Sequence, residues 1–267
     1  MNKIKIYQVD AFTNELFSGN PAAVCPLDNW LPDEVMQSIA LENNYSETAF
    51  FIRDQNKFFI RWFTPEVEID LCGHATLAAA HILFTEMDFQ EDIVEFKTNN
   101  GEILKVKKNN NILKMDFPSH DPKISDQNLE EVSQALGILP VSFYFCNYGL
   151  AVFNNEEDII KIRPNFSVLE NLPYDGIIVT APGDKVDFVS RFFGPKLGIP
   201  EDPVTGGAHC VLIPYWSKRL NKKDMFARQL SKRGGELHCS FLGNRVYIGG
   251  EATTYLKGEL LLNNIKV

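Results

Sequence analysis

The sequence predicts an α+β fold with two similar halves, each a central helix wrapped by sheet. Three observations lead to this prediction. Strand-like segments dominate the chain, two helical segments are apolar on nearly all sides, and the residues around these two helices resemble each other. With 267 residues, the chain is long enough for one large domain or two small ones with a buried core.

The first half is predicted to contain two helices. Apolar residues recur at helical spacing over 31–43, after a proline near the start of this segment. The segment after Gly73, ATLAAAHILF, is apolar all round, which is typical of a buried helix. Runs of β-branched and aromatic residues predict strands at 3–12, within 19–24, and at 48–52, 58–63, 93–97, 102–107 and 112–117.

The second half repeats this order. An amphipathic helix over 128–137 ends at a glycine, and a second apolar helix contains AHCVLIPYW. Strands are predicted at 141–146, 176–181 and 186–193, and as a run of short strands from about residue 225. The polar, proline-containing stretch 118–126 marks the boundary. We therefore expect lobes at 1–117 and 118–255, with a last strand at about 256–267 that returns to the first lobe.

Two segments of the chain resemble each other. Residues 61–72 (RWFTPEVEIDLC) lie over 191–202 (RFFGPKLGIPED), with Arg, Phe, Pro and Ile at matched places. In this alignment Cys72 falls on Asp202. Gly73 then meets Gly206 after three further residues, and both glycines enter an apolar helix. The match predicts two homologous halves.

Composition indicates which kinds of partner and which cellular compartment to expect. The formal net charge of -9 argues against nucleic acid and against a basic membrane-binding patch. No apolar run approaches the length of a membrane span, and MNKIKIYQVDAF has no apolar signal core. The five cysteines are an odd number with no CxxC spacing. We therefore expect free thiols and a cytoplasmic protein.

Glycines at the two predicted helix starts suggest an anion site. The first N–H groups of a helix lack partners within the helix, and glycine lets a ligand approach them. We expect a carboxylate or phosphate to be held by backbone N–H groups over 73–75 and 206–208, that is, at Gly73, His74, Ala75, Gly206, Gly207 and Ala208. Tight packing of a buried helix is the alternative reason for one such glycine, but their matched positions favour the ligand.

Titratable residues beside these helix starts admit two interpretations each. Asp202 is either a turn residue or a group that binds substrate or transfers a proton, and its neighbour Glu201 is expected to face solvent. A helix start disfavours imidazolium, so His74 is expected to be neutral, as a ligand contact or a packing residue. His209 and His81 lie deeper in their helices and are expected to be structural.

Cys72 and Glu47 are the remaining candidates. A helix start lowers the pKa of a thiol, so Cys72 could act as a base, but an inert buried cysteine is the commoner case. No metal is expected, because Cys72, His74, His209 and Cys210 lack the spacing of structural zinc ligands. Residue chemistry alone favours Glu47 as an exposed glutamate at a strand start.

These segments together resemble the PhzF family of phenazine-biosynthesis-like isomerases, whose fold is shared with diaminopimelate epimerase. The resemblance rests on YQVDAF, GNPAAV, NNYSETAFF, RWFTPEVEIDLCGHATLAAAHIL, DFVSRFFGPKLGIPEDPVTGGAHC and KRGGE. It implies two lobes, each a barrel-like, mostly antiparallel sheet around a central helix, with the active site between them. It also implies a homodimer without metal or organic cofactor.

The resemblance assigns roles to individual residues. It places the acid/base glutamate on Glu47 and the family's His and Asp on His74 and Asp202. Many members have a serine where this chain has Gly207, so a hydroxyl that would contact substrate is missing while the backbone N–H remains. Related epimerases place a cysteine base in each half. Here only Cys72 stands at such a position, which argues against a two-thiol racemase.

We therefore expect a cytoplasmic, cofactor-independent isomerase that moves a proton between carbons of a small carboxylated substrate. Glu47 would carry the proton, and His74 and Asp202 would orient the substrate and hold developing charge. Two alternatives stay open at this point. One is a racemase or epimerase that uses Cys72 with Asp202 or Glu47. The other is a carboxylate-binding protein without turnover.

Overall fold

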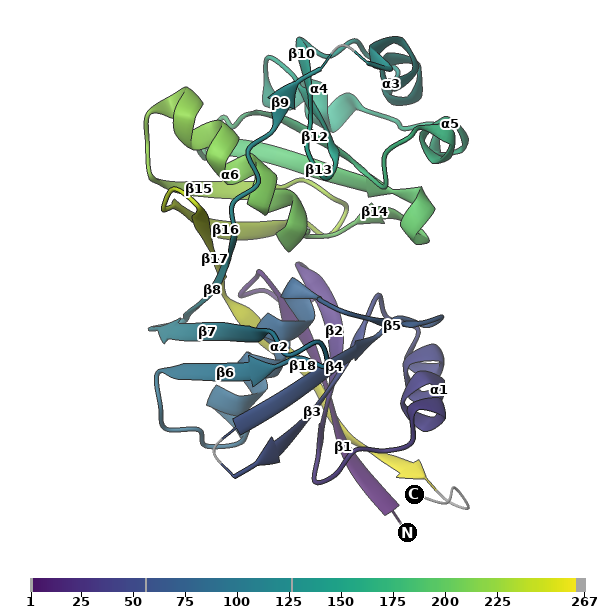
Figure 1. The fold of residues 1–267 in the computed structure, drawn as a ribbon, viewed down its shortest axis with the longest axis vertical. Coiled ribbons are helices and arrows are strands. Elements are labelled where there is room, and N and C mark those ends of the chain that lie inside the picture. The colour runs from purple at the N-terminus through teal and green to yellow at the C-terminus, as the bar shows by residue number, and fades with distance from the viewer. Residues whose placement is uncertain (1, 56, 126, 263–267) are drawn as a thin grey trace. The chain divides into compact units, whose positions relative to one another are not determined.

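The computed structural model describes residues 2–55, 57–125 and 127–262. The chain forms two compact units (Figure 1): Met1–Asp116 with Gly249–Val267, and Phe117–Ile248. The second unit thus begins at Phe117, against the expected 118, and the chain returns to the first unit at Gly249, against the expected residue of about 256. Residues 263–267 of the expected last strand lie outside the described residues.

The first unit is built around helix α2 (Gly73–Glu86), which packs against β1, β2, β3 and β18. Ten of its side chains are buried, as expected of a helix that is apolar all round. The other elements are β1 (Asn2–Ala11), β2 (Asn20–Leu27), α1 (Asp33–Asn43), β3 (Thr48–Asp54), β4 (Lys57–Phe63), β5 (Glu68–Ile69), β6 (Ile93–Lys97), β7 (Ile103–Asn109), β8 (Ile112–Pro118) and β18 (Ala252–Leu262).

The second unit is built around helix α6 (Gly206–Leu220), which packs against β16. Its other elements are β9 (Lys123–Ile124), α3 (Leu129–Leu136), β10 (Ser142–Phe145), β11 (Gly149–Val152), α4 (Glu156–Lys161), α5 (Phe166–Asn171), β12 (Ile177–Pro182), β13 (Phe188–Gly194), a 3-10 turn (Pro195–Leu197), β14 (Ile199–Asp202), β15 (Asp224–Gln229), β16 (Gly235–Phe241) and β17 (Arg245–Gly250). The predicted mixed α and β fold is confirmed.

The two units share one strand topology. In the first, β2–β3 is parallel, β3–β4 antiparallel and β4–β6 parallel; in the second, β11–β12, β12–β13 and β13–β15 repeat this sequence. The register agrees as well, because Thr48 lies opposite Phe63 and Ile177 lies opposite Phe193. The matched Phe63 and Phe193 therefore make Thr48 equivalent to Ile177.

The strand register corrects the sequence alignment of the two halves. Trp62 pairs with Ile69, and its counterpart Phe192 pairs with Asp202. Asp202 is therefore equivalent to Ile69, so its predicted match with Cys72 is wrong. The residue equivalent to Cys72 is Thr205, because each stands directly before its helix in an extended conformation. The three extra residues of the second half correspond in number to the 3-10 turn before β14, a turn that spacing alone does not reveal.

Helices α4 and α5 were not predicted. Each begins after an asparagine whose side chain accepts a backbone N–H: Asn155 from Asp158, and Asn165 from Val168. The acidic first turn of α4 was a readable helix-start signal. Among the helices that the structure describes, none is both long and apolar enough to cross a membrane.

Candidate active site

Glu47 and His74 form a buried pair at the start of α2. Glu47 directly precedes β3, and its carbonyl accepts the N–H of Ala23, which fixes the backbone there. His74 is the second residue of α2. Its Nε2 lies 3.1 Å from Oε2 of Glu47, and the two residues are only 6% and 7% exposed. The expectation of an exposed Glu47 from residue chemistry is therefore wrong, because β2 and α2 enclose the strand start.

The facing atoms of this pair are close but poorly aligned. Neither Oε2 of Glu47 nor Nε2 of His74 has a hydrogen-bond partner among the described residues, although they are within ion-pair distance. A buried polar atom without a partner is costly and calls for an explanation such as a catalytic role or a missing ligand. The pair is therefore the strongest chemical feature of this unit.

The other ring nitrogen of His74 faces two further side chains. Asn20 Nδ2 lies 3.3 Å from Nδ1, and Cys72 Sγ lies 3.5 Å from it. Asn20 is the first residue of β2 and is fully buried. It was not singled out as a site residue, although it belongs to the GNPAAV segment that carried the family resemblance. The imidazole is thus held on both sides, with the carboxylate at one nitrogen and an amide and a thiol at the other.

Burial and charge set the protonation of this cluster. Burial raises the pKa of the Cys72 thiol, and the nearby Glu47 carboxylate raises it further, so the thiol stays protonated near neutral pH. Burial lowers the pKa of His74, and the negative charges of ionised Cys72 and of Glu47 raise it by more, so that pKa lies well above 6.5. While the thiol is protonated, the Glu47 carboxylate is the charge that favours a protonated His74. It acts against the helix dipole, which led us to expect a neutral ring.

In the second unit, Asp202 is anchored at the end of β14. It is 8% exposed, and its Oδ2 accepts the Thr205 hydroxyl at 2.5 Å. Gln229 links the same segment, because its Nε2 donates to the Asp202 carbonyl at 2.8 Å and its Oε1 accepts the Thr205 N–H at 3.0 Å. No motif or spacing pointed to Gln229, which lies 27 residues from Asp202 along the chain.

The first turn of α6 contains the predicted Gly206, Gly207 and Ala208 and has no acidic residue. A Cβ atom on Gly207 would lie 3.3 Å from the Tyr148 hydroxyl. Tyr148 is held by Phe192, edge to face at 5.1 Å. Burial raises the pKa of Tyr148, so its hydroxyl remains a hydrogen-bond donor at neutral pH. Sequence reasoning did not find Tyr148, because it lies in a loop and gives no periodic signal.

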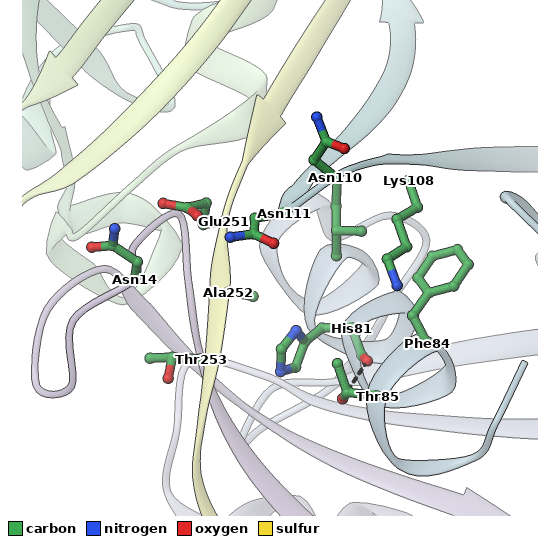
Figure 2. Close-up of a pocket in the computed structure, with 11 residues that line it drawn as sticks. Asn14, His81, Phe84, Thr85, Lys108, Asn110, Asn111, Glu251, Ala252 and Thr253 are labelled. Atoms are coloured by element: carbon green, nitrogen blue, oxygen red, sulfur yellow. Dashed lines mark hydrogen bonds between the residues drawn. The ribbon is translucent and has the colours of Figure 1, made fainter.

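His209 and His81, which were expected to be structural, lie deeper in their helices. His209 is fully buried, its Nδ1 lies 2.8 Å from the Thr205 carbonyl, and burial lowers its pKa to about 4. The Nε2 of His81 lies 3.0 Å from the Thr254 hydroxyl. His81 lines a hollow of about 240 Å³ in the first unit (Figure 2). The asparagines and Lys108 around this hollow are exposed, and it contains no buried acid–base pair.

Glu201 was expected to face solvent, and this is wrong. Its two carboxylate oxygens accept from Arg191 Nε at 2.7 Å and Nη2 at 3.0 Å. The guanidinium also lies 4.8 Å from the ring centre of Phe193. The antiparallel pairing of β13 with β14 brings the two residues together across ten residues of sequence, which the sequence pattern does not show.

Comparison with known proteins agrees with this architecture. The profile of the PhzC–PhzF family, described as phenazine biosynthesis-like protein, matches residues 9–258. An uncharacterized isomerase of Pseudomonas aeruginosa is 49% identical over 98% of this chain and 100% of its own length. The human phenazine biosynthesis-like domain-containing protein is 38% identical over 97% of this chain and 99% of its own.

Solved structures extend the comparison. A PhzF-family protein of Enterococcus faecalis matches with a TM-score of 0.96 and 49% identity over 98% of this chain and 100% of that one. A hydroxyproline epimerase of Agrobacterium vitis, with bound trans-4-hydroxy-L-proline, matches with a TM-score of 0.64 and 9% identity over 98% and 93%, which shows a shared fold. The chain therefore belongs to the phenazine biosynthesis-like (PhzC–PhzF) family and is an isomerase of that type.

Proposed function

We propose that the protein moves a proton between carbons of a small carboxylated substrate, with Glu47 as the proton carrier. One observation carries the proposal. Oε2 of Glu47 and Nε2 of His74 are buried at the start of α2 and face each other at 3.1 Å without a hydrogen-bond partner among the described residues. An acid–base group poised in this way is what proton transfer to and from carbon requires.

The chemistry follows from these positions. The Glu47 carboxylate takes a proton from an acidic C–H of the substrate, and the electron pair moves into the adjoining conjugated system. The positive potential at the start of α2 and a protonated His74 stabilise the negative charge that develops. Glu47 then returns the proton to another carbon, so the substrate is isomerised without an oxidant or a cofactor-derived group.

Asp202 has the role of orienting group in this proposal. Its carboxylate is fixed by Thr205, and its backbone by Gln229. The first-turn N–H groups of α2 and α6 are the proposed carboxylate binders. That both helix starts serve one substrate stays a prediction.

The racemase alternative is less well supported. A two-thiol mechanism needs a second cysteine at the position equivalent to Cys72, and that position holds Thr205. Burial also keeps the Cys72 thiol protonated, because it raises the pKa.

Hydrogen exchange in heavy water tests the proposal. A thermal-shift screen with cyclic and amino carboxylates first identifies a ligand, because binding raises the melting temperature even without turnover. Deuterium incorporation into that ligand is then followed by NMR. Glu47→Gln keeps the shape of the side chain but cannot accept a proton. It should slow exchange by about 10²–10⁴-fold and leave the thermal shift nearly intact.

Glu66→Gln, at an exposed glutamate, is the matched control and should exchange at the wild-type rate. Normal exchange in Glu47→Gln, or joint loss of exchange and ligand binding with the fold intact, would remove Glu47 from this role. Ligand binding by the wild type without any exchange would instead indicate a carboxylate-binding protein.

A further inference from the structure

We propose that Glu47, Cys72 and His74 also form a binding site for Zn²⁺ and similar divalent ions. One carboxylate oxygen, one sulfur and one ring nitrogen from these residues lie within 4.8 Å of one another. No other group of three such residues comes as close within residues 2–55, 57–125 and 127–262. Spacing along the chain did not reveal the site, because Glu47 reaches it from a strand 25 residues before Cys72.

The donor set suits zinc. Thiolate sulfur, imidazole nitrogen and carboxylate oxygen are its usual protein ligands, and three of them leave one tetrahedral position open. Neighbouring donor atoms in a tetrahedral zinc site are about 3.5 Å apart, given bonds of about 2.0–2.3 Å. Cys72 Sγ and His74 Nδ1 are already 3.5 Å apart. The Glu47 carboxylate faces Nε2, the other ring nitrogen, and would have to move toward Nδ1 and Sγ to reach the same spacing.

Two features of the surroundings decide the strength of binding. A metal ion would satisfy Glu47 Oε2, a buried atom without a hydrogen-bond partner among the described residues. The start of α2 carries positive potential, which opposes a cation. The two anionic ligands outweigh this opposition, because they sit in direct contact with the ion whereas the helix contributes about half a charge. On binding, the Cys72 S–H bond and the N–H bond of the protonated His74 ring at the ligating nitrogen both break. The sulfur and the nitrogen then bind the metal, and two protons are released to solvent.

The same ion would block the proposed reaction. A metal bound to the Glu47 carboxylate and the His74 ring occupies the groups that would handle the proton. This consequence rests on the proposed function, whereas the metal site itself does not. Zinc would then act as a reversible inhibitor of this protein and would not be its cofactor.

Cobalt provides a test that needs no substrate. Co²⁺ is added to the reduced, metal-free protein, and the near-ultraviolet charge-transfer band of a thiolate–cobalt bond is recorded. We expect a band that saturates at one Co²⁺ per chain and disappears when Zn²⁺ is added. Cys72→Ser should abolish the band and weaken Zn²⁺ binding about 100-fold or more, as measured by calorimetry.

Matched variants make the outcome decisive. Cys210→Ser changes another buried cysteine and should keep the full band. Glu47→Gln should keep a band but bind Zn²⁺ at least about 10-fold more weakly, with release of the Cys72 proton retained. If Cys72→Ser fails to fold, the cobalt band of Cys210→Ser and the Zn²⁺ affinity of Glu47→Gln still test the proposal. Absence of the band in the wild type, or its loss in Cys210→Ser alone, would overturn the proposal, as would unchanged binding in Glu47→Gln.

Discussion

The starts of α2 and α6 have equivalent backbones and different side chains. Thr48 is equivalent to Ile177, so Glu47 corresponds to Gly176. The hydrogen bond from the Ala23 N–H to the Glu47 carbonyl recurs between Gly149 and Gly176. The helix positions correspond as well: Cys72 to Thr205, His74 to Gly207 and Ala75 to Ala208.

In the first unit, this space holds the side chain of Glu47. In the second unit, the aromatic rings of Phe192 and Tyr148 fill the equivalent space. A Cβ atom on Gly176 would lie 2.3 Å from the Phe192 ring, and one on Gly207 would lie 3.3 Å from the Tyr148 hydroxyl. The second unit therefore has no room for an acid–base pair at these places. Its carboxylate, Asp202, stands at the end of β14, where the first unit has Ile69. The difference favours one proton carrier over a symmetric pair of bases.

Both units keep an arginine–glutamate ion pair of similar design, in which the arginine is more buried than the glutamate. Arg61 binds both oxygens of Glu68, at 2.7 and 2.6 Å, and lies 5.1 Å from the ring centre of Phe63. Arg191 binds both oxygens of Glu201 and lies over Phe193. The two units thus share this ion pair and differ at the residues to which the proposed proton transfer is assigned.

Breaking these ion pairs is expected to lower stability strongly at every pH. Arg61→Met and Arg191→Met should each lower the free energy of unfolding by about 2–3 kcal/mol, somewhat less than for a fully buried pair because the glutamates are partly exposed. Urea unfolding measures the loss. Lysine at either position keeps the positive charge but cannot form the bidentate contact with the glutamate. It should therefore recover only part of the lost free energy of unfolding. If one of the two variants lost less than about 0.5 kcal/mol of unfolding free energy, the Arg61–Glu68 and Arg191–Glu201 pairs would not be energetically equivalent.

His74 and His209, each in the first turn of its helix, should respond to pH with opposite signs. The folded-state pKa of His209 is about 4, below the ordinary 6.5, so its contribution to stability falls as the pH drops from 6.5 to 4. The full change is about 3 kcal/mol, at about 1.4 kcal/mol per pKa unit. The pKa of His74 is raised, so its stabilisation is present below 6.5 and is lost as the pH rises through the folded-state value.

Unfolding free energies from pH 4 to 9 measure both effects. His209→Gln should flatten the acid side of the profile, and His74→Gln the alkaline side. The slopes are the readout, because either substitution can also lower stability by a constant amount. An unchanged acid slope in His209→Gln would show that its burial does not control its protonation.

The longer regular elements could be predicted from the sequence, because their apolar spacing is local, whereas the short helices α4 and α5 were missed. The two central helices follow from apolar runs that begin at glycine, and the strands from β-branched and aromatic runs. The site was predicted less completely. Asn20, Tyr148 and Gln229 act through contacts between segments distant along the chain, and Glu201 was misjudged because its partner lies on the neighbouring strand. The alignment of Cys72 with Asp202 failed because spacing does not reveal where an insertion lies.

A smaller effect should show how tightly the α6 start is packed. Gly207→Ala adds one Cβ atom 3.3 Å from the Tyr148 hydroxyl. The same substitution also gains helix propensity, so a single variant is ambiguous. A double-mutant cycle with Tyr148→Phe isolates the contact and should give a coupling free energy of about 0.5–1 kcal/mol. A coupling near zero would mean that this helix start has room for a side chain, as the α2 start does.

The smallest effect is expected for Cys72→Ser. Cys72 is 6% exposed, burial raises the pKa of its thiol, and its counterpart Thr205 is no second thiol base. The serine hydroxyl can replace the S–H contact to Nδ1 of His74. The variant should therefore retain exchange within about threefold of the wild-type rate, a change of less than about 0.7 kcal/mol in activation free energy. A thiol-dependent racemase would lose nearly all activity. Loss of exchange with an unchanged melting temperature would transfer the proton-carrying role from Glu47 to Cys72. The difference between the two helix starts would then lie in Cys72 and Thr205, and no longer in Glu47 and Gly176.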